Sequence, residues 1–190
     1  MADDPEGVLE FWLGEVGEDR WYIADDDLDA EIEGRFGDLW RAARDGGLDH
    51  WIDGPAGSLA FCVLTDQFPR NMFRGSAMAF DTDPLALDAA ERAITAGWDR
   101  EVPTPERQFF YLPFEHSERI EDQNRAVDLI ATRLESAENL LHARAHRSVI
   151  ERFGRFPFRN DALGRDNTGA EDEFMAAGAY GGVVRALRDA

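Results

Sequence analysis

The chain has 190 residues, of which 39 are acidic and 20 are basic, and its formal net charge at pH 7 is −19. Every basic residue is an arginine. A surface with this charge repels nucleic acid and anionic membranes, so neither is expected as a partner. No stretch approaches the roughly 20 consecutive apolar residues of a membrane span, and the acidic N-terminal sequence lacks the features of a signal peptide. We therefore expect a cytoplasmic protein.

The lysine-free acidic composition also predicts an adaptation to salt. Like charges on such a surface repel one another, and dissolved salt screens that repulsion. We interpret the composition as halophilic. Acidic solubility combined with a codon bias that favours arginine is the alternative. The charge therefore does not identify a substrate.

The first half of the chain carries signals for three helices. Asp4 can cap the first, and the second runs from about Asp26 to the glycine pair that begins at Gly46. The third covers residues 58–67 and is apolar enough to be buried, with Cys62 as a buried thiol. It should end near residue 68, because Pro69 disfavours a helical conformation in the residue before it.

Further helix signals follow through the second half, and no run alternates with strand period for long. The expected starts are near Asp83, Thr104, Ser117, Ala137 and Thr168. Pro113 interrupts the fifth helix, and Ser117 caps the sixth, with Glu118 in its first turn. A short helix is expected after Gly178. The sequence thus predicts one all-α domain over residues 1–190, with about eight helices in antiparallel pairs.

The first of three polar segments at helix ends covers residues 66–74. Asp66 lies near the C-terminal end of a helix, where a carboxylate is unfavourable, so Arg70 or Arg74 should pair with it. A fixed guanidinium there could bind an anion. The alternative is an ion pair that only ties the turn. The candidate ligand-binding residues are Gln67, Arg70, Asn71 and Arg74.

The second polar segment covers residues 111–123. Glu115 and His116 follow Pro113, where a distorted backbone could bring a carboxylate and an imidazole together as an acid–base pair. Adjacent residues on a regular helix do not face each other, which is the argument against it. We name Glu115, His116 and Asp66 as the candidate catalytic residues.

The third polar segment covers residues 152–165 and places four arginines among aromatic residues. In so acidic a chain this cluster could attract an anion, or it could neutralise the acidic helices around it. The candidate ligand-binding residues are Arg155, Arg159 and Asn160.

Two histidines, His142 and His146, lie four residues apart on one helix face. This spacing can bind zinc, but the segment lacks the glutamate of the metalloprotease helix motif, and no cysteine pair accompanies it. We expect no metal and no cofactor, and we include His146 as a candidate ligand-binding residue.

The motifs together resemble a family of bacterial and archaeal proteins called domain of unknown function 924. They are VLEFWLG at residues 8–14, Trp51, DQFPRN at 66–71, FRG at 73–75, DPLAL at 83–87, LPFEHSE at 112–118 and FGRFPFRN at 153–160. The resemblance implies an all-α fold of the tetratricopeptide-like class and brings no established activity. This chain departs from the family pattern at Phe158, where the pattern has His, and at Asn167-Thr168, where it has Ser-Thr.

Three functions fit these residues. A binding module would hold a small anionic molecule or a peptide carboxylate through the arginines. A hydrolase would activate water through Glu115 or Asp66, with His116 as the proton donor. A protein-interaction scaffold would use the polar segments only to hold helices together. We expect the three segments to meet at one end of a helical stack.

Overall fold

The computed structural model describes residues 4–190, which form helices joined by loops and turns, without a strand. The chain divides into two compact units, one ending at Pro113 and the other beginning at Phe114. The predicted all-α class is confirmed. The tetratricopeptide-like arrangement and the single-domain organisation stay predictions. No helix within residues 4–190 is both long enough and apolar enough to cross a membrane.

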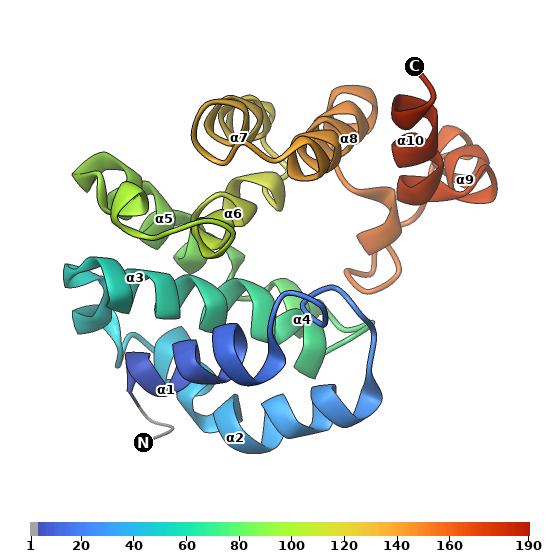
Figure 1. The fold of residues 1–190 in the computed structure, drawn as a ribbon. Coiled ribbons are helices and arrows are strands. Elements are labelled where there is room, and N and C mark those ends of the chain that lie inside the picture. Colours follow the sequence, from blue (N-terminus) through green and yellow to red (C-terminus); the bar gives the residue numbers. More distant parts are fainter. Residues whose placement is uncertain (1–3) are drawn as a thin grey trace. The chain divides into compact units, whose positions relative to one another are not determined.

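The first unit consists of short and long helical segments that follow one another closely (Figure 1). The α-helices are α1 (Pro5–Leu9), α2 (Asp26–Arg44), α3 (Pro55–Cys62), α4 (Phe68–Met72) and α5 (Asp83–Ala96). Two π-helical segments are η1 (Glu10–Val16) and η3 (Val63–Gln67), and the 3-10 segments are η2 (Asp49–Asp53), η4 (Ala77–Phe80), η5 (Trp98–Glu101) and η6 (Glu106–Phe110). Helix α3 packs against both α1 and α5, and α2 packs against α4.

Buried aromatic rings hold this unit together. Phe68 lies against the rings of Phe11, Trp12 and Phe36, with ring centroids 4.9 to 6.0 Å apart. All four side chains are at most 1% exposed. Ring contacts at these distances add to the large apolar area that aromatic residues bury.

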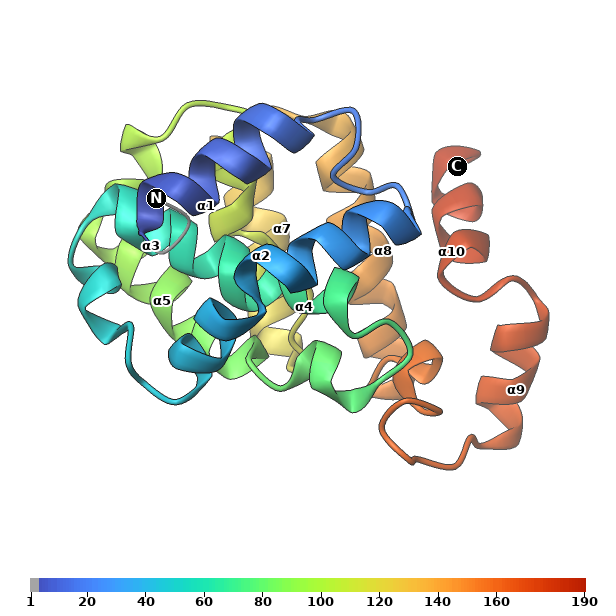
Figure 2. The ribbon, with the colours of Figure 1, turned by 90° about the horizontal axis from the view of Figure 1, so that it is seen from below.

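The second unit is built around one long helix. Helix α6 (Leu112–Glu115) reaches into it and is followed by α7 (Ile120–Arg133), α8 (Ala137–Phe153), η7 (Pro157–Arg159), α9 (Gly169–Ala176) and α10 (Ala179–Arg188). Helix α8 packs against α7 on one side and α10 on the other, as Figures 1 and 2 show. Its inward residues, Val149 and Ile150, form the core with Phe156 and Phe174.

The prediction that the third helix ends near Phe68 is wrong, because the helical path continues through η3 into α4. Proline lacks an N–H and its ring crowds the carbonyl four residues earlier. Here that carbonyl belongs to Thr65, and it instead accepts a hydrogen bond of 2.6 Å from the Thr82 hydroxyl. The wider π-helical turn before Pro69 accommodates the ring.

The predicted cap at Ser117 is also wrong. Helix α7 begins at Ile120, and Ser117 accepts a hydrogen bond from the amide of Arg119 and donates one to Asp122. Glu118 precedes the helix, so it does not lie in the first turn. The expected fifth helix is divided between η6 and α6, and Pro113 lies in the first turn of α6, where a missing N–H is harmless.

Candidate functional site

The first polar segment forms a set of internal hydrogen bonds. Asp66 is 1% exposed, and its Oδ1 lies 3.0 Å from Nη2 of Arg70. Its Oδ2 accepts a hydrogen bond from the side-chain amide of Gln67. Arg70 also reaches Asp83 at the start of α5 and the carbonyl of Ala79, both at 3.0 Å. The expected pairing of Asp66 with an arginine is confirmed, and both oxygens of this candidate general base accept hydrogen bonds.

The rest of the segment binds to α2. Arg74 donates from Nε and Nη2 to the two oxygens of Asp29, at 2.6 and 2.9 Å. Asn71 donates to the same carboxylate at 2.8 Å. Both residues therefore join the end of α4 to α2. The sequence gives no local signal for Asp29, which lies 45 residues from Arg74.

Glu115 is positioned by the end of α6 and by a glutamine from α7. The side-chain amide of Gln123 donates to the carbonyl oxygens of Glu115 and Ser117, at 2.6 and 2.7 Å, and it is fully buried. These bonds satisfy carbonyls that the short helix leaves without partners. The Glu115 side chain is thereby held at a fixed point inside the second unit.

The carboxylate of Glu115 pairs with His146 on α8. Its Oε2 lies 3.2 Å from Nδ1 of His146, and the two side chains are 2% and 16% exposed. The other oxygen, Oε1, is buried and has no hydrogen-bond partner among residues 4–190. An oxygen of this kind is rare in folded proteins, because an unpaired buried acceptor costs free energy.

His116 does not form the pair with Glu115 that the sequence suggested, because the partner of the Glu115 carboxylate is His146. The ring of His116 lies beside that of His146, with centroids 6.0 Å apart and the planes nearly perpendicular. Phe156 contacts the same imidazole edge to face at 5.6 Å. His146 is therefore the residue around which this part of the second unit is arranged.

A series of neighbouring polar side chains leads from this pair toward the surface. The hydroxyl of Tyr180, on α10, lies 3.4 Å from Nδ1 of His146 and 2.6 Å from Nδ1 of His142. Nε2 of His142 lies 3.3 Å from Oε1 of Glu138. The side chain of Glu138 is 62% exposed, in contrast to that of Glu115. These side chains thus connect a buried carboxylate with a solvent-exposed one.

The hydrogen-bond partners of the two imidazoles indicate which ring nitrogens carry a hydrogen. Nδ1 of His146 faces two acceptors, the carbonyl of His142 at 3.0 Å and the Glu115 carboxylate, so it carries a hydrogen. His142 donates from Nε2 to Glu138, so its Nδ1 accepts from the hydroxyl of Tyr180. Burial, and secondarily the charges of Glu115 and Glu138, raise the pKa of Tyr180, which keeps its phenol protonated as a donor.

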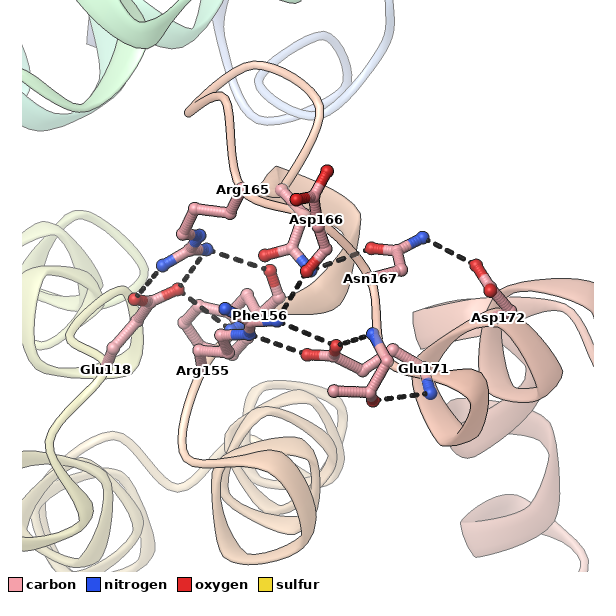
Figure 3. Close-up of polar contacts among 10 residues, drawn as sticks. Glu118, Arg155, Phe156, Arg165, Asp166, Asn167, Glu171 and Asp172 are labelled. Atoms are coloured by element: carbon pink, nitrogen blue, oxygen red, sulfur yellow. Dashed lines mark hydrogen bonds and ion pairs between the residues drawn. The ribbon is translucent and has the colours of Figure 1, made fainter.

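Two arginines of the third segment form ion pairs with carboxylates of neighbouring segments (Figure 3). Arg155 donates to both oxygens of Glu171, at 2.7 and 2.8 Å. Arg165 donates to both oxygens of Glu118, at 2.7 and 2.9 Å, and the amide of Phe156 donates to the same carboxylate. Bidentate pairs of this geometry hold the loop before α9 in place.

The remaining candidates of the third segment also contact their neighbours. The guanidinium of Arg159 lies 4.5 Å above the ring of Phe156, and Asn160 donates to the side chain of Asn167 at 2.8 Å. Phe158 stacks on Phe156 and meets Tyr180 edge to face. An aromatic ring therefore borders the cluster at this position.

The structure thus brings Glu115, His116 and His146 together in the second unit. Asp66, Arg70, Asn71 and Arg74 belong to the first unit. That all three segments meet at one end of a stack stays a prediction. Sequence reasoning missed Tyr180 and Glu138 as members of the cluster. Glu138 lies four residues before His142, a spacing that could have indicated it.

The fold and the cluster define an all-helical protein with a buried carboxylate–imidazole pair that side chains connect to the surface. Residues 8–179 match a family described as a bacterial protein of unknown function (DUF924), and the chain belongs to this family. It is similar to a solved protein of unknown function, ATU0120 from Agrobacterium tumefaciens, with 43% identity and a TM-score of 0.86. That match covers 90% of this chain and 96% of the other. No curated protein matches the chain.

Proposed function

We propose that the second unit is an acid–base site that hydrolyses a small substrate with an activated water molecule. The observation that carries the proposal is the Glu115 carboxylate, whose Oε2 is fixed by His146 while the buried Oε1 has no partner among the described residues. An oxygen held in this way can accept a proton from water at a defined position.

The contacts of Glu115 and His146 support the following roles. Glu115 Oε1 takes a proton from water, and the water oxygen forms a bond to the electrophilic carbon or phosphorus of the substrate. The bond to the leaving group breaks, and protonated His146 gives the leaving group a proton from Nε2. Glu115 then loses its proton to the solvent, and Nε2 of His146 takes one up from the solvent. Both groups thereby return to their starting states, and the net reaction consumes only water.

This assignment changes the one suggested by the sequence. His146 replaces His116 as the proton donor, because it is His146 that contacts Glu115. Asp66 is not needed as a base, since its oxygens are engaged by Arg70 and Gln67.

The test is turnover of p-nitrophenyl acetate and p-nitrophenyl phosphate by the purified chain and by Glu115→Gln. Loss of a positioned general base typically lowers the rate by about 10²- to 10⁴-fold, so we expect at least a hundredfold loss in the variant. Glu173→Gln on α9, an exposed position, is the matched control and should keep the rate. Equal rates for Glu115→Gln and the intact chain, with both folded by circular dichroism, would contradict the proposal.

The binding of an anion is a second candidate, carried by the arginines. Arg74 is the most exposed of the paired candidates, at 46%, so an anion could replace Asp29 on its guanidinium. A thermal-shift measurement with phosphate or citrate at about 1 mM tests this, because a ligand of the folded state raises the melting temperature. Stabilisation that disappears in Arg74→Gln would support it, and none in the intact chain would oppose it.

A further inference from the structure

A pocket in the first unit belongs to none of the three polar segments. Its volume is about 330 Å³, which is within the size range of small-molecule sites. It is lined by Leu9, Leu13, Pro55, Ala56, Leu59, Glu101, Val102, Pro103 and Glu106. The pocket thus lies where η1 and α3 meet the segment around η5 and η6.

The lining combines apolar walls with negative charge. Glu101 and Glu106 are its charged members, and all other lining residues are apolar. Oε2 of Glu106 is buried without a hydrogen-bond partner among residues 4–190. The neighbouring guanidinium of Arg107 donates instead to the carbonyl oxygens of Val102 and Arg100, at 2.9 and 3.4 Å.

We propose that this pocket binds a small organic cation, an ammonium group attached to a compact hydrocarbon body. A buried carboxylate oxygen is stabilised by a cationic donor more than by any neutral partner. The apolar walls would cover the hydrocarbon body and remove it from water. The two glutamates disfavour an anion. A neutral molecule would leave the Glu106 carboxylate without a cation to pair with.

The volume sets the size of the ligand. A ligand of about six carbons with one ammonium group fits within a pocket of this volume. Larger cations such as peptides would extend beyond the lining residues. This proposal concerns the first unit alone and is independent of the acid–base site around Glu115.

The experiment compares three probes that share one hydrocarbon body: hexylammonium, hexanol and hexanoate. Binding is measured by titration calorimetry in about 0.5 M NaCl, because salt at that level screens the nonspecific attraction of a cation to a chain with a charge of −19. We expect hexylammonium to bind at least tenfold more tightly than hexanol, and hexanoate not to bind. Equal binding of hexylammonium and hexanol, or no binding of hexylammonium, would overturn the proposal.

Variants locate the binding. Glu106→Gln removes the charge, and Ala56→Trp fills the pocket from an exposed position on α3; each should weaken hexylammonium binding at least tenfold. Glu173→Gln carries the same charge change as the first but lies on α9, so it should bind as the intact chain does. Unchanged affinity in both pocket variants would show that the cation binds elsewhere and would overturn the assignment.

Discussion

The two oxygens of the Glu115 carboxylate have different surroundings, and this difference organises the residues near it. Oε2 faces an imidazole and Oε1 has no partner among the described residues. His146 faces the carboxylate, a main-chain carbonyl and the Tyr180 hydroxyl with one nitrogen. One substitution at Tyr180 should therefore change two histidines at once.

We predict that Tyr180→Phe alters the histidine nitrogens while leaving the fold in place. In the intact chain, nitrogen-15 NMR should find a hydrogen on Nδ1 of His146 and on Nε2 of His142, as their partners require. The variant removes the donor to Nδ1 of His142, so that nitrogen should shift strongly. We expect a loss of about 1 kcal/mol in unfolding free energy, the usual value for one hydrogen bond. An unchanged His142 spectrum would show that Tyr180 is not its donor.

A second residue-scale prediction concerns Thr82, whose hydroxyl connects two buried groups. It accepts a hydrogen bond of 3.0 Å from the indole of Trp40 and donates to the carbonyl of Thr65. Thr82→Val keeps the shape but leaves both groups unpaired, so we expect a loss of about 1–3 kcal/mol in urea unfolding. Thr95→Val, at an exposed position on α5, should cost much less. Similar losses in the two variants would contradict this role.

At the scale of elements, the loop between α8 and α9 depends on its ion pairs. Arg155, and secondarily the amide of Thr168, hold the pKa of Glu171 well below its ordinary value of 4.5. The folded chain then binds fewer protons than the unfolded chain, so its stability rises with pH in this window and is lost as the pH falls below about 4.5.

We therefore predict that acid lowers the melting temperature of the second unit and that Glu171→Gln reduces this pH dependence. The variant should also melt at a lower temperature than the intact chain at pH 7, because Arg155 loses a bidentate partner. Melting curves followed by circular dichroism between pH 2 and pH 7 measure both effects. Glu173→Gln, two residues away and exposed, is the control. Parallel curves for Glu171→Gln and the intact chain would count against the assignment.

The elements also show which features the sequence could predict. The expected helix start near Ala137 is confirmed by α8, because the cap at Ser136 is a local signal. Helix α9 starts after Thr168 as expected, and Thr168 forms a capping box with Glu171. The partners of Arg74 and Arg155 were missed because they lie 45 and 16 residues away, and only the fold brings them near.

The sequence did not predict that the helical path continues through Pro69, nor that Tyr180 belongs to the cluster around Glu115 and His146. The reasons are related. A proline signals a helix end locally, but the structure offers the freed carbonyl of Thr65 a distant donor. Tyr180 lies 38 residues from His142, and no spacing rule connects them. Local chemistry thus predicted the helices and the candidate residues, while their partners depended on tertiary packing.

At the scale of the whole molecule, charge should dominate stability. With a net charge of −19, repulsion acts across the surface at low ionic strength, where the screening length exceeds about 10 Å. We propose that the chain is adapted to salt, and we predict a lower melting temperature, or loss of the helical circular-dichroism signal, on dialysis into a buffer of low ionic strength. Recovery with NaCl but not with sucrose of equal osmolality would identify screening as the cause. A constant melting temperature from low to high NaCl would contradict the proposal.

The division into two units has a practical consequence for spectroscopy. The five tryptophans, at positions 12, 21, 40, 51 and 98, all precede Pro113, whereas the second unit has none. Tryptophan emission therefore reports on the first unit, and far-ultraviolet circular dichroism reports on the helices of both. Recording the two signals in the same urea titration will show whether the units unfold together, because separate transitions give different midpoints for the two signals.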